Sequence, residues 1–166
     1  MTVRTWVPAY VAIGSNLDDP RSQVERAFAA LGELRGSQLV ARSSLYRSRP
    51  LGPVAQPDFV NAVAGMVTTL GPAEMLAELK ATEARLGRAT PIERWGPRLI
   101  DLDLLVHGGA RIDEPGLRLP HPGLAGRAFV LVPLAEFAAD LDVPGVGRVR
   151  ALAARVGRDD LERIAA

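Results

Sequence analysis

The sequence predicts an α+β fold, a ferredoxin-like sandwich in which helices pack on one face of an antiparallel sheet and long loops gather at one side. The main observation is the order of the segments, which read strand, helix, strand, strand, helix, strand and are separated by Gly and Pro. The second is size: 166 residues, 48% hydrophobic and 23% charged, suit one globular domain over residues 1–166.

The composition excludes several classes of function. The formal net charge is +1, and the basic residues are spread along the chain, so we expect no nucleic-acid partner. Because the chain has no cysteine, disulfides, thiolate nucleophiles and Cys-ligated zinc are excluded. No apolar run approaches the roughly 20 residues of a membrane span, and the N-terminus lacks the pattern of a signal peptide. We expect a cytoplasmic monomer without a membrane partner.

The first strand is expected over residues 6–13, and Gly14-Ser15-Asn16 ends it. That turn is either a plain connection to a helix or a set of N–H groups presented to an anion, and the sequence leaves both open. A helix opened by Asp18-Asp19-Pro20 then runs to about Gly32, with apolar residues at helical spacing. The second strand is expected over residues 38–46.

A loop with three prolines follows over residues 47–57, and a loop of this length in a compact domain is often functional. The third strand, residues 59–69, is interrupted by Asn61, whose amide must find hydrogen-bond partners either among its neighbours or on a ligand. A second helix is expected over residues 72–86 and a second long loop, rich in Arg and Pro, over residues 88–98.

The rest of the chain begins with a strand over residues 99–106, which is short, apolar and bounded by Gly-Pro and Gly-Gly. We expect a short hairpin through Gly108-Gly109 to Ile112, and a third helix over residues 127–137 despite its internal proline. A Pro-Gly turn and a short helix near residues 149–156 complete the chain.

Two carboxylates interrupt the strand at residues 99–106. Side chains alternate along a strand, so Asp101 and Asp103 should share a face with their Cβ atoms about 7 Å apart. At an effective dielectric near 20 they repel by about 2 kcal/mol, and a positive group should lie between them. A divalent cation such as Mg²⁺ favours oxygen ligands of this kind. The alternative is a solvated strand face on which both carboxylates pair with Arg94 and Arg98.

The surroundings of this pair favour a ligand site. A loop carrying Trp95 and two arginines leads into it, and Pro120-His121-Pro122 and Arg127 follow. Carboxylates for a metal, arginines for phosphate and an aromatic side chain for a flat ring together suit a nucleotide with Mg²⁺. Neither Gly-x-x-x-x-Gly-Lys-Ser/Thr nor Gly-x-Gly-x-x-Gly occurs in the sequence, so phosphate would be bound in another way.

At this point the pattern resembles the family of 6-hydroxymethyl-7,8-dihydropterin pyrophosphokinases, over most of the chain to about Pro133. The Arg-x-x-Asp-x-Asp signature is matched in full by Arg98, Asp101 and Asp103. The other matching segments are residues 10–17, 43–47, 50–53, 56–62, 94–105, 120–121 and 127–129.

The resemblance implies an enzyme of folate biosynthesis that moves the pyrophosphoryl group of ATP to 6-hydroxymethyl-7,8-dihydropterin and releases AMP. It implies that Asp101 and Asp103 hold two Mg²⁺ ions and act in catalysis together with Arg88 and Arg98. The implied pterin contacts are Ser48, Arg49, Leu51, Phe59, Asn61, Trp95 and Phe129. The implied ATP contacts are Glu83, Arg88, Trp95, Arg98, Leu104, His121 and Arg127.

The chain departs from some members at Thr90, Gly116 and Arg118, where those members have basic or polar residues near ATP. Two other readings remain. A metal-dependent phosphohydrolase or nuclease would also use Asp101 and Asp103, but the aromatic residues and Asn61 favour a bound flat acceptor. A non-catalytic binding module of ferredoxin-like fold would leave the two carboxylates unexplained.

Overall fold

The computed structural model describes residues 4–87, 96–158 and 160–165. Within these residues the main sheet has six strands in the order β10-β3-β4-β1-β5, with β2 also paired to β4. Every pairing is antiparallel, which confirms the predicted sandwich. The strands of this sheet are β1 (Val7–Ser15), β2 (Ser37–Arg42), β3 (Tyr46–Ser48), β4 (Phe59–Thr68), β5 (Asp101–His107) and β10 (Glu162–Arg163).

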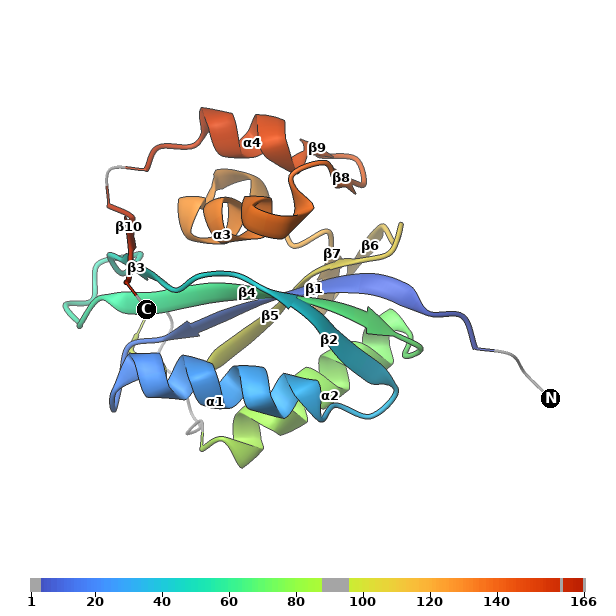
Figure 1. Ribbon diagram of the computed structural model, residues 1–166, viewed down its shortest axis with the longest axis horizontal. Helices are drawn as coiled ribbons and strands as arrows, with labels where there is room; N and C mark the ends of the chain where they lie inside the picture. Colours follow the sequence, from blue (N-terminus) through green and yellow to red (C-terminus); the bar gives the residue numbers. More distant parts are fainter. Residues whose placement is uncertain (1–3, 88–95, 159, 166) are drawn as a thin grey trace.

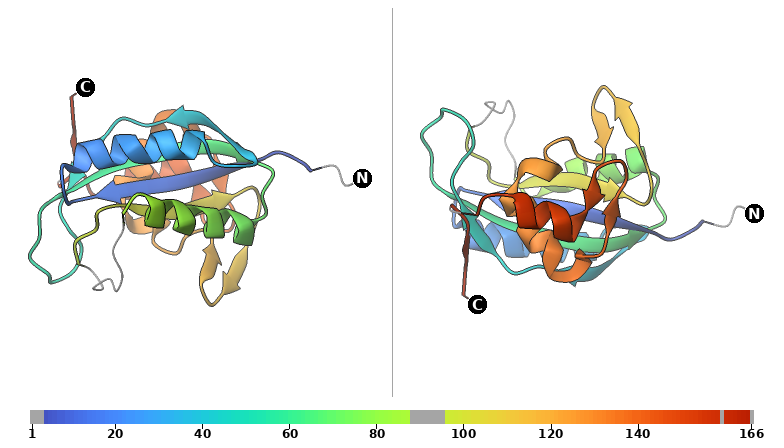
Figure 2. Two further views of the ribbon diagram at one scale, coloured as in Figure 1. Left: turned by 90° about the horizontal axis from the view of Figure 1, so that it is seen from below. Right: turned by 90° about the horizontal axis from the view of Figure 1, so that it is seen from above.

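Helices cover both faces of this sheet (Figure 1). The first pair, α1 (Pro20–Gly32) and α2 (Pro72–Arg85), lies side by side on one face, and α3 (Ala128–Ala138) and α4 (Val149–Arg155) lie over the other (Figure 2). The expectation of helices on one face was therefore incomplete. The physical reason is visible in β4, which is buried at nearly every position, because a strand that is apolar on both sides needs cover on both.

Two apolar clusters fill the space between these layers. The cluster under α1 and α2 includes Phe28, Leu31 and Leu79, and the one under α3 and α4 includes Leu131 and Leu134. All five side chains are at most 2% exposed, and each such burial contributes about 1.5–3 kcal/mol. The sheet is thereby held from both sides.

The second strand is broken in two, unlike the single strand predicted over residues 38–46. At the break, Ser43 N–H donates to the Val63 carbonyl at 3.0 Å, and Ser43 Oγ accepts Val63 N–H at 2.8 Å. Glu136 of α3 accepts hydrogen bonds from Ser44 N–H and the Tyr46 hydroxyl. Burial and then this bond raise the pKa of Tyr46 to about 12, so its hydroxyl remains a donor. Serine hydroxyls compete with the backbone in this way and divert a strand.

The sequence predicted a hairpin through Gly108-Gly109, and it was wrong about which strand pairs with residues 112–114. The chain does turn there, with Ala110 N–H donating to the His107 carbonyl at 3.0 Å. However, β6 (Ile112–Glu114) pairs with β7 (Leu117–Leu119) rather than with β5. The tighter turn is Pro115-Gly116, where Gly116 has φ +84°, as expected for Pro followed by Gly in a type II turn.

The smaller elements complete the chain. They are the 3-10 helix Leu124–Gly126, β8 (Asp142–Val143) and β9 (Gly147–Arg148). The C-terminal strand β10 returns to β3, next to which Ile164 N–H donates to the Leu45 carbonyl at 2.9 Å. Among the described residues, no helix combines the length and apolar character that a membrane span needs.

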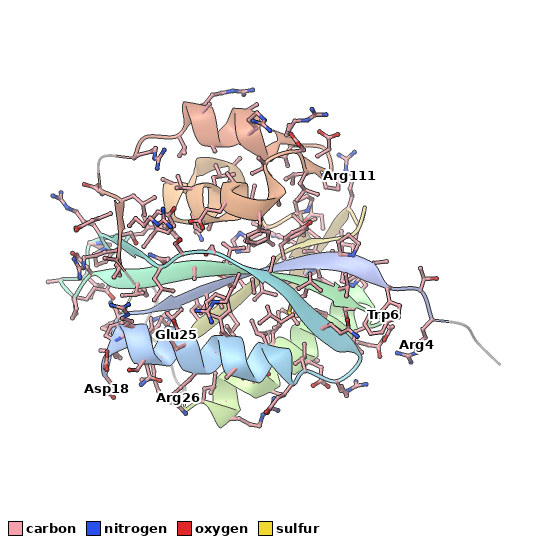
Figure 3. The ribbon with its side chains drawn as sticks, in the orientation of Figure 1. Arg4, Trp6, Asp18, Glu25, Arg26 and Arg111 are labelled. Carbon is pink, nitrogen blue, oxygen red and sulfur yellow. The ribbon has the colours of Figure 1, made fainter. Side chains whose placement is uncertain are left out.

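The outside of the molecule is charged. In Figure 3 the labelled side chain of Asp18 lies just before α1 and those of Glu25 and Arg26 lie on α1, and all three are exposed. Glu25 forms an ion pair with Arg42 at 2.8 Å, and exposed pairs of this kind add at most about 1 kcal/mol. The residues predicted to carry the function are not among these exposed charges and lie at one end of the sheet.

Candidate active site

A cavity of about 360 Å³ opens on the face of the sheet that α3 covers. It is lined by side chains from β1, β3, β4 and β5, by the start of α3 and by the two long loops. The lining residues are Ala12, Ile13, Gly14, Ser48, Arg49, Leu51, Phe59, Asn61, Gly96, Arg98, Asp101, Asp103, Arg127, Phe129 and Val130. The topology thus brings together most of the residues singled out from the sequence.

Asp101 and Asp103 line this cavity from β5, opposite Gly14 and Ala12 of β1. Both are half-buried, whereas Leu102 between them is buried on the other face, so the alternation predicted for the strand is confirmed. Among the described residues, no group of three or more His, Cys, Asp or Glu side chains is arranged to hold a metal. A cation bound by these two carboxylates would therefore need further oxygen ligands from a substrate or from water.

Asn61 projects from β4 into the same cavity and is 5% exposed. Its Nδ2 donates to Ser48 Oγ at 2.6 Å, because β3 and β4 pair with Ser48 opposite Phe59, two residues from Asn61. Its Oδ1 faces Gly14, where a Cβ atom would lie 3.4 Å away. The amide is thus fixed in orientation at the wall of the cavity.

Two aromatic rings line the same cavity as this amide. Phe59 precedes Asn61 by two positions on β4, and Phe129 stands in the first turn of α3 on the covering layer. Both are half-buried. Flat ring systems gain about 0.5–1.5 kcal/mol from each aromatic neighbour beyond simple burial, so this part of the cavity suits a flat heterocycle.

The cationic side of the cavity carries Arg98 and Arg127. Arg98 Nη1 donates to the carbonyls of Gly96 at 2.7 Å and Pro97 at 3.2 Å, and these bonds fold its side chain back over its own loop. The Arg127 guanidinium lies 5.8 Å from the centre of the Phe129 ring. Guanidinium groups suit phosphate oxygens because several N–H donors lie in one plane.

His121 lies beside this group and is held in one tautomer. Its backbone N–H donates to the Leu105 carbonyl at 2.9 Å, and its Nδ1 accepts the Gly123 N–H at 3.0 Å. The proton of the neutral ring is therefore on Nε2. Burial and then the charge of Arg127 lower the pKa of His121, against an opposing effect of Asp101. The ring is thus a neutral N–H donor near pH 7.

Three of the predicted ATP contacts within the described residues lie outside the lining, namely His121, Glu83 and Leu104. Glu83 on α2 is 7% exposed, and its Oε2 accepts the Leu102 N–H of β5 at 2.7 Å. Leu104 is 4% exposed and packs in the cluster under α1 and α2. Both border the outer edge of β5 and not the cavity itself. Arg88 and Trp95 lie outside the described residues, as do Arg94 and Thr90.

Among the residues to which the sequence gave no settled binding role are Gly14, which lines the cavity, and Asn16, which lies outside its lining. Gly14 is part of β1 and lines the cavity, where the missing side chain leaves room in front of Asn61. Asn16 donates its N–H to the Arg98 carbonyl at 3.0 Å, which favours the plain turn over the anion-binding turn. The Gly-Ser-Asn segment ending a buried strand was the available signal for both.

Comparison with known proteins shows the family of the chain. The model of the family described as 7,8-dihydro-6-hydroxymethylpterin-pyrophosphokinase (HPPK) matches residues 10–139. The 2-amino-4-hydroxy-6-hydroxymethyldihydropteridine pyrophosphokinase of Pseudomonas aeruginosa is 46% identical over 155 residues, which are 93% of this chain and 95% of that protein. The protein of the same name from Haemophilus influenzae is 46% identical over 138 residues, 83% of this chain and 86% of that one.

A solved structure supports the fold independently. The Plasmodium falciparum HPPK-DHPS crystal structure with pteroate superposes with a TM-score of 0.77 at 14% sequence identity, covering 100% of this chain and 47% of that chain. At that identity the likeness concerns the fold alone. The sequence relatives and the family match decide the rest: the chain belongs to the 7,8-dihydro-6-hydroxymethylpterin-pyrophosphokinase family.

Proposed function

We propose that this cavity transfers the pyrophosphoryl group of ATP to the hydroxymethyl oxygen of 6-hydroxymethyl-7,8-dihydropterin and releases AMP. The chain is a pteridine pyrophosphokinase of folate biosynthesis by family and by its relatives. The observation that carries the proposed site is a single cavity whose lining combines a buried, oriented amide and two aromatic residues with a pair of carboxylates on one strand face.

The amide end of the cavity suits the pterin. A pterin is a flat ring system with hydrogen-bond donors and acceptors along one edge, and Asn61 offers both kinds of group in a fixed orientation. Phe59 and Phe129 would lie against the ring faces. Backbone groups from Ser48 to Leu51 border the same space, and Ser48, Arg49 and Leu51 all line it. A site of this kind rejects rings that lack the matching polar edge.

The carboxylate end suits the triphosphate with its metal. Asp101 and Asp103 supply oxygen ligands on one face, and the donor set fits Mg²⁺, with two ions expected. Bound there, the metal would neutralise triphosphate charge and lower the proton affinity of the acceptor hydroxyl. Arg98 and Arg127 would meet the phosphates, and His121 would donate its Nε2–H to them. The outer edge of β5 near Leu104 lies where a nucleoside could be held by backbone groups.

The reaction needs positioning more than covalent catalysis. A bond forms between the hydroxymethyl oxygen and the β-phosphorus of ATP, and the bond from that phosphorus to the oxygen of the departing AMP breaks. The hydroxyl proton leaves to solvent. The residues of the chain hold the acceptor in line, stabilise charge on the leaving AMP and exclude water, which would otherwise hydrolyse ATP. We further propose that the protein acts as a monomer in the cytoplasm.

One assay tests the proposal. The protein is incubated with ATP, Mg²⁺ and the reduced hydroxymethylpterin, and the nucleotide and pterin products are separated. We expect equal amounts of AMP and pyrophosphorylated pterin, no AMP without the pterin, and none after chelation of the metal. Free phosphate formed without the pterin would favour a phosphohydrolase, and nicking of added nucleic acid would favour a nuclease. Pterin binding without any product would favour a binding module.

A further inference from the structure

Asn16 connects three segments at the end of the sheet that carries the cavity. It follows β1, is 2% exposed, and is absent from the cavity lining. Its Nδ2 donates to Gln56 Oε1 at 2.8 Å and to the Pro57 carbonyl at 2.9 Å. Its Oδ1 accepts the Arg98 N–H at 2.8 Å, and its own N–H donates to the Arg98 carbonyl at 3.0 Å. One side chain therefore bridges two loops that are far apart in the sequence.

The partners fix the orientation of this amide. The Pro57 carbonyl can only accept a hydrogen bond, so it must face Nδ2, and the Arg98 backbone N–H can only donate, so it must face Oδ1. Both hydrogens of the amide and its oxygen are thus used. Aspartate has the same shape but no donor, and it would place a carboxylate against the Pro57 carbonyl. No other side chain of this size offers both functions in one plane.

The two bridged loops carry opposite halves of the site. The loop that holds Gln56 and Pro57 also contributes Arg49 and Leu51 to the lining and leads into Phe59. The segment that holds Arg98 contributes Gly96 and Arg98 and leads into Asp101. A displacement of either loop changes the hydrogen bonds of Asn16 and is thereby transmitted to the other loop, because all four bonds are made by one buried residue.

From this geometry we infer that Asn16 is a positioning residue that couples the pterin half of the cavity to the phosphate half. The inference rests on the proposed function, since it takes its two ligands from it. Asn16 touches neither substrate and acts through Arg98 on one side and the 49–58 loop on the other. Binding of the nucleotide then favours the loop position that binds the pterin, and by thermodynamic linkage the pterin favours the nucleotide to the same degree.

The test measures this coupling directly. Pterin affinity is determined by calorimetry with and without a non-hydrolysable ATP analogue and Mg²⁺, and AMP formation is measured on the same samples. In the natural protein we expect the analogue to raise pterin affinity by a factor within the range of about 5–150 that is usual for coupled sites. In Asn16→Ala this factor should fall to about 1, with each single-ligand affinity within about threefold of normal and kcat reduced.

Two further variants separate the two arms of the bridge. Asn16→Asp keeps the acceptor for Arg98 N–H, but unlike Asn16→Ala it places a carboxylate against the Pro57 carbonyl. That repulsion displaces the loop, so this variant should weaken pterin binding about tenfold or more while ATP binding changes by less than about threefold. Gln56→Ala removes one partner from a half-buried loop residue and should lower the coupling factor about fivefold, the effect of one neutral hydrogen bond. Gln56→Ala also decides the matter if the Asn16 variants do not fold.

Thr68→Val is the matched control. Thr68 is 0% exposed and clamps a turn at the far end of β4, where its hydroxyl contacts Ser37, Gly36 and Leu70. The Thr68→Val variant should have lower thermal stability than the natural protein but the same coupling factor. The inference is overturned if the natural protein forms AMP yet shows no coupling, or if the Asn16 and Gln56 variants keep the full factor. It is also overturned if both affinities fall together in proportion to lost stability. Absence of AMP from the natural protein would instead contradict the proposed function.

Discussion

The two halves of the cavity are built differently. The half proposed to bind the pterin, called the pterin half, is formed on paired strands, and its polar groups Asn61 and Ser48 are 5% and 6% exposed and bonded to each other. The half proposed to bind the phosphates, called the phosphate half, is formed by Asp101, Asp103 and Arg98, which are all half-buried and lie on an edge strand or on the loop before it. The pterin half is thus buried and held by a hydrogen bond between its side chains, whereas the phosphate half is charged and more exposed to solvent.

This difference indicates when each half reaches its working geometry. A buried amide held by a neighbour keeps its orientation before the ligand arrives, so it selects by shape and polarity. Half-exposed charges are hydrated and repel or attract one another over several ångströms, so their arrangement depends on the ions that bind. Substitutions in the two halves should therefore have different effects on substrate binding and on AMP formation.

The largest effect is expected at the carboxylate pair. Asp101→Asn and Asp103→Asn should each lower AMP formation by about 100-fold or more, since even groups that only orient a metal ligand are worth 10–100-fold. Melting temperature without metal should not fall, because like-charge repulsion is relieved. AMP release at saturating Mg²⁺ and thermal melts measure both quantities.

The control for this pair is Asp113→Asn, which alters an 89% exposed carboxylate of β6 in an ion pair with Arg118 of β7 and should change neither quantity. The alternative reading, in which Asp101 and Asp103 only form structural ion pairs, requires the opposite outcome. A folded variant of either residue with nearly normal AMP release and reduced stability would exclude the metal role.

The next effect is expected in the pterin half. Asn61→Ala should weaken pterin binding about 10–100-fold, because the polar edge of the ring would then lack its buried partner. ATP binding should change by less than about twofold. Calorimetry with each substrate alone measures both, and Ser48→Ala is the milder comparison, since it removes only the group that orients the amide. Unchanged pterin affinity in folded Asn61→Ala would remove Asn61 from the site.

A smaller effect is expected from Gly14→Ala. The added methyl group would lie 3.4 Å from Asn61 Oδ1 and 3.7 Å from Phe59 Cδ1, which is ordinary contact distance and leaves the fold intact. It does take up space in front of the amide, so pterin affinity should fall about fivefold, a mild case of overpacking. Binding titrations detect this, with ATP affinity as the internal reference. Equal losses for both substrates would place the methyl group outside the pterin half.

The smallest effect concerns pH. Burial and Arg127 lower the pKa of His121 in the folded state, so the unfolded state binds the proton more readily. The stability contributed by the neutral ring is therefore complete above the unfolded value of about 6.5 and is lost as pH falls below it. Chemical unfolding of the natural protein and His121→Gln between pH 8 and 5 should show the difference in stability shrinking with acid. A difference that grows with acid would contradict the assignment.

The sequence predicted the parts of this molecule that depend on local pattern. The element order followed from the apolar runs of β1, β4 and β5 and from the helical spacing of α1 and α2. Few compact topologies are compatible with that order. The alternation around Leu102 placed Asp101 and Asp103 on one face because a strand has a period of two. Asn61 was recognised because an amide inside an apolar strand needs a partner.

The parts that it missed depend on contacts between distant segments. The turn at Gly108 was visible, but the choice of β7 as the partner of β6 rested on the Pro115-Gly116 turn, which was not considered. The break at Ser43 depends on Val63 and Glu136, which are far away in sequence. Glu83 was expected near the nucleoside, and its bond to Leu102 N–H arises only when α2 packs beside the edge of β5.

The bond from the Leu102 N–H to Glu83 also affects whether copies of the protein can pair through the edge of β5. A strand at the edge of a sheet invites another chain to pair with it, and such pairing leads to aggregation. On β5 the Leu102 N–H is taken by Glu83 and the Leu105 carbonyl by His121, so only the short stretch around Leu104 lies between two occupied positions. A small ligand can use that stretch, whereas a second polypeptide cannot extend a ladder along it. The Glu83 side chain and the His121 backbone thus occupy groups that edge-to-edge pairing with a second chain would need.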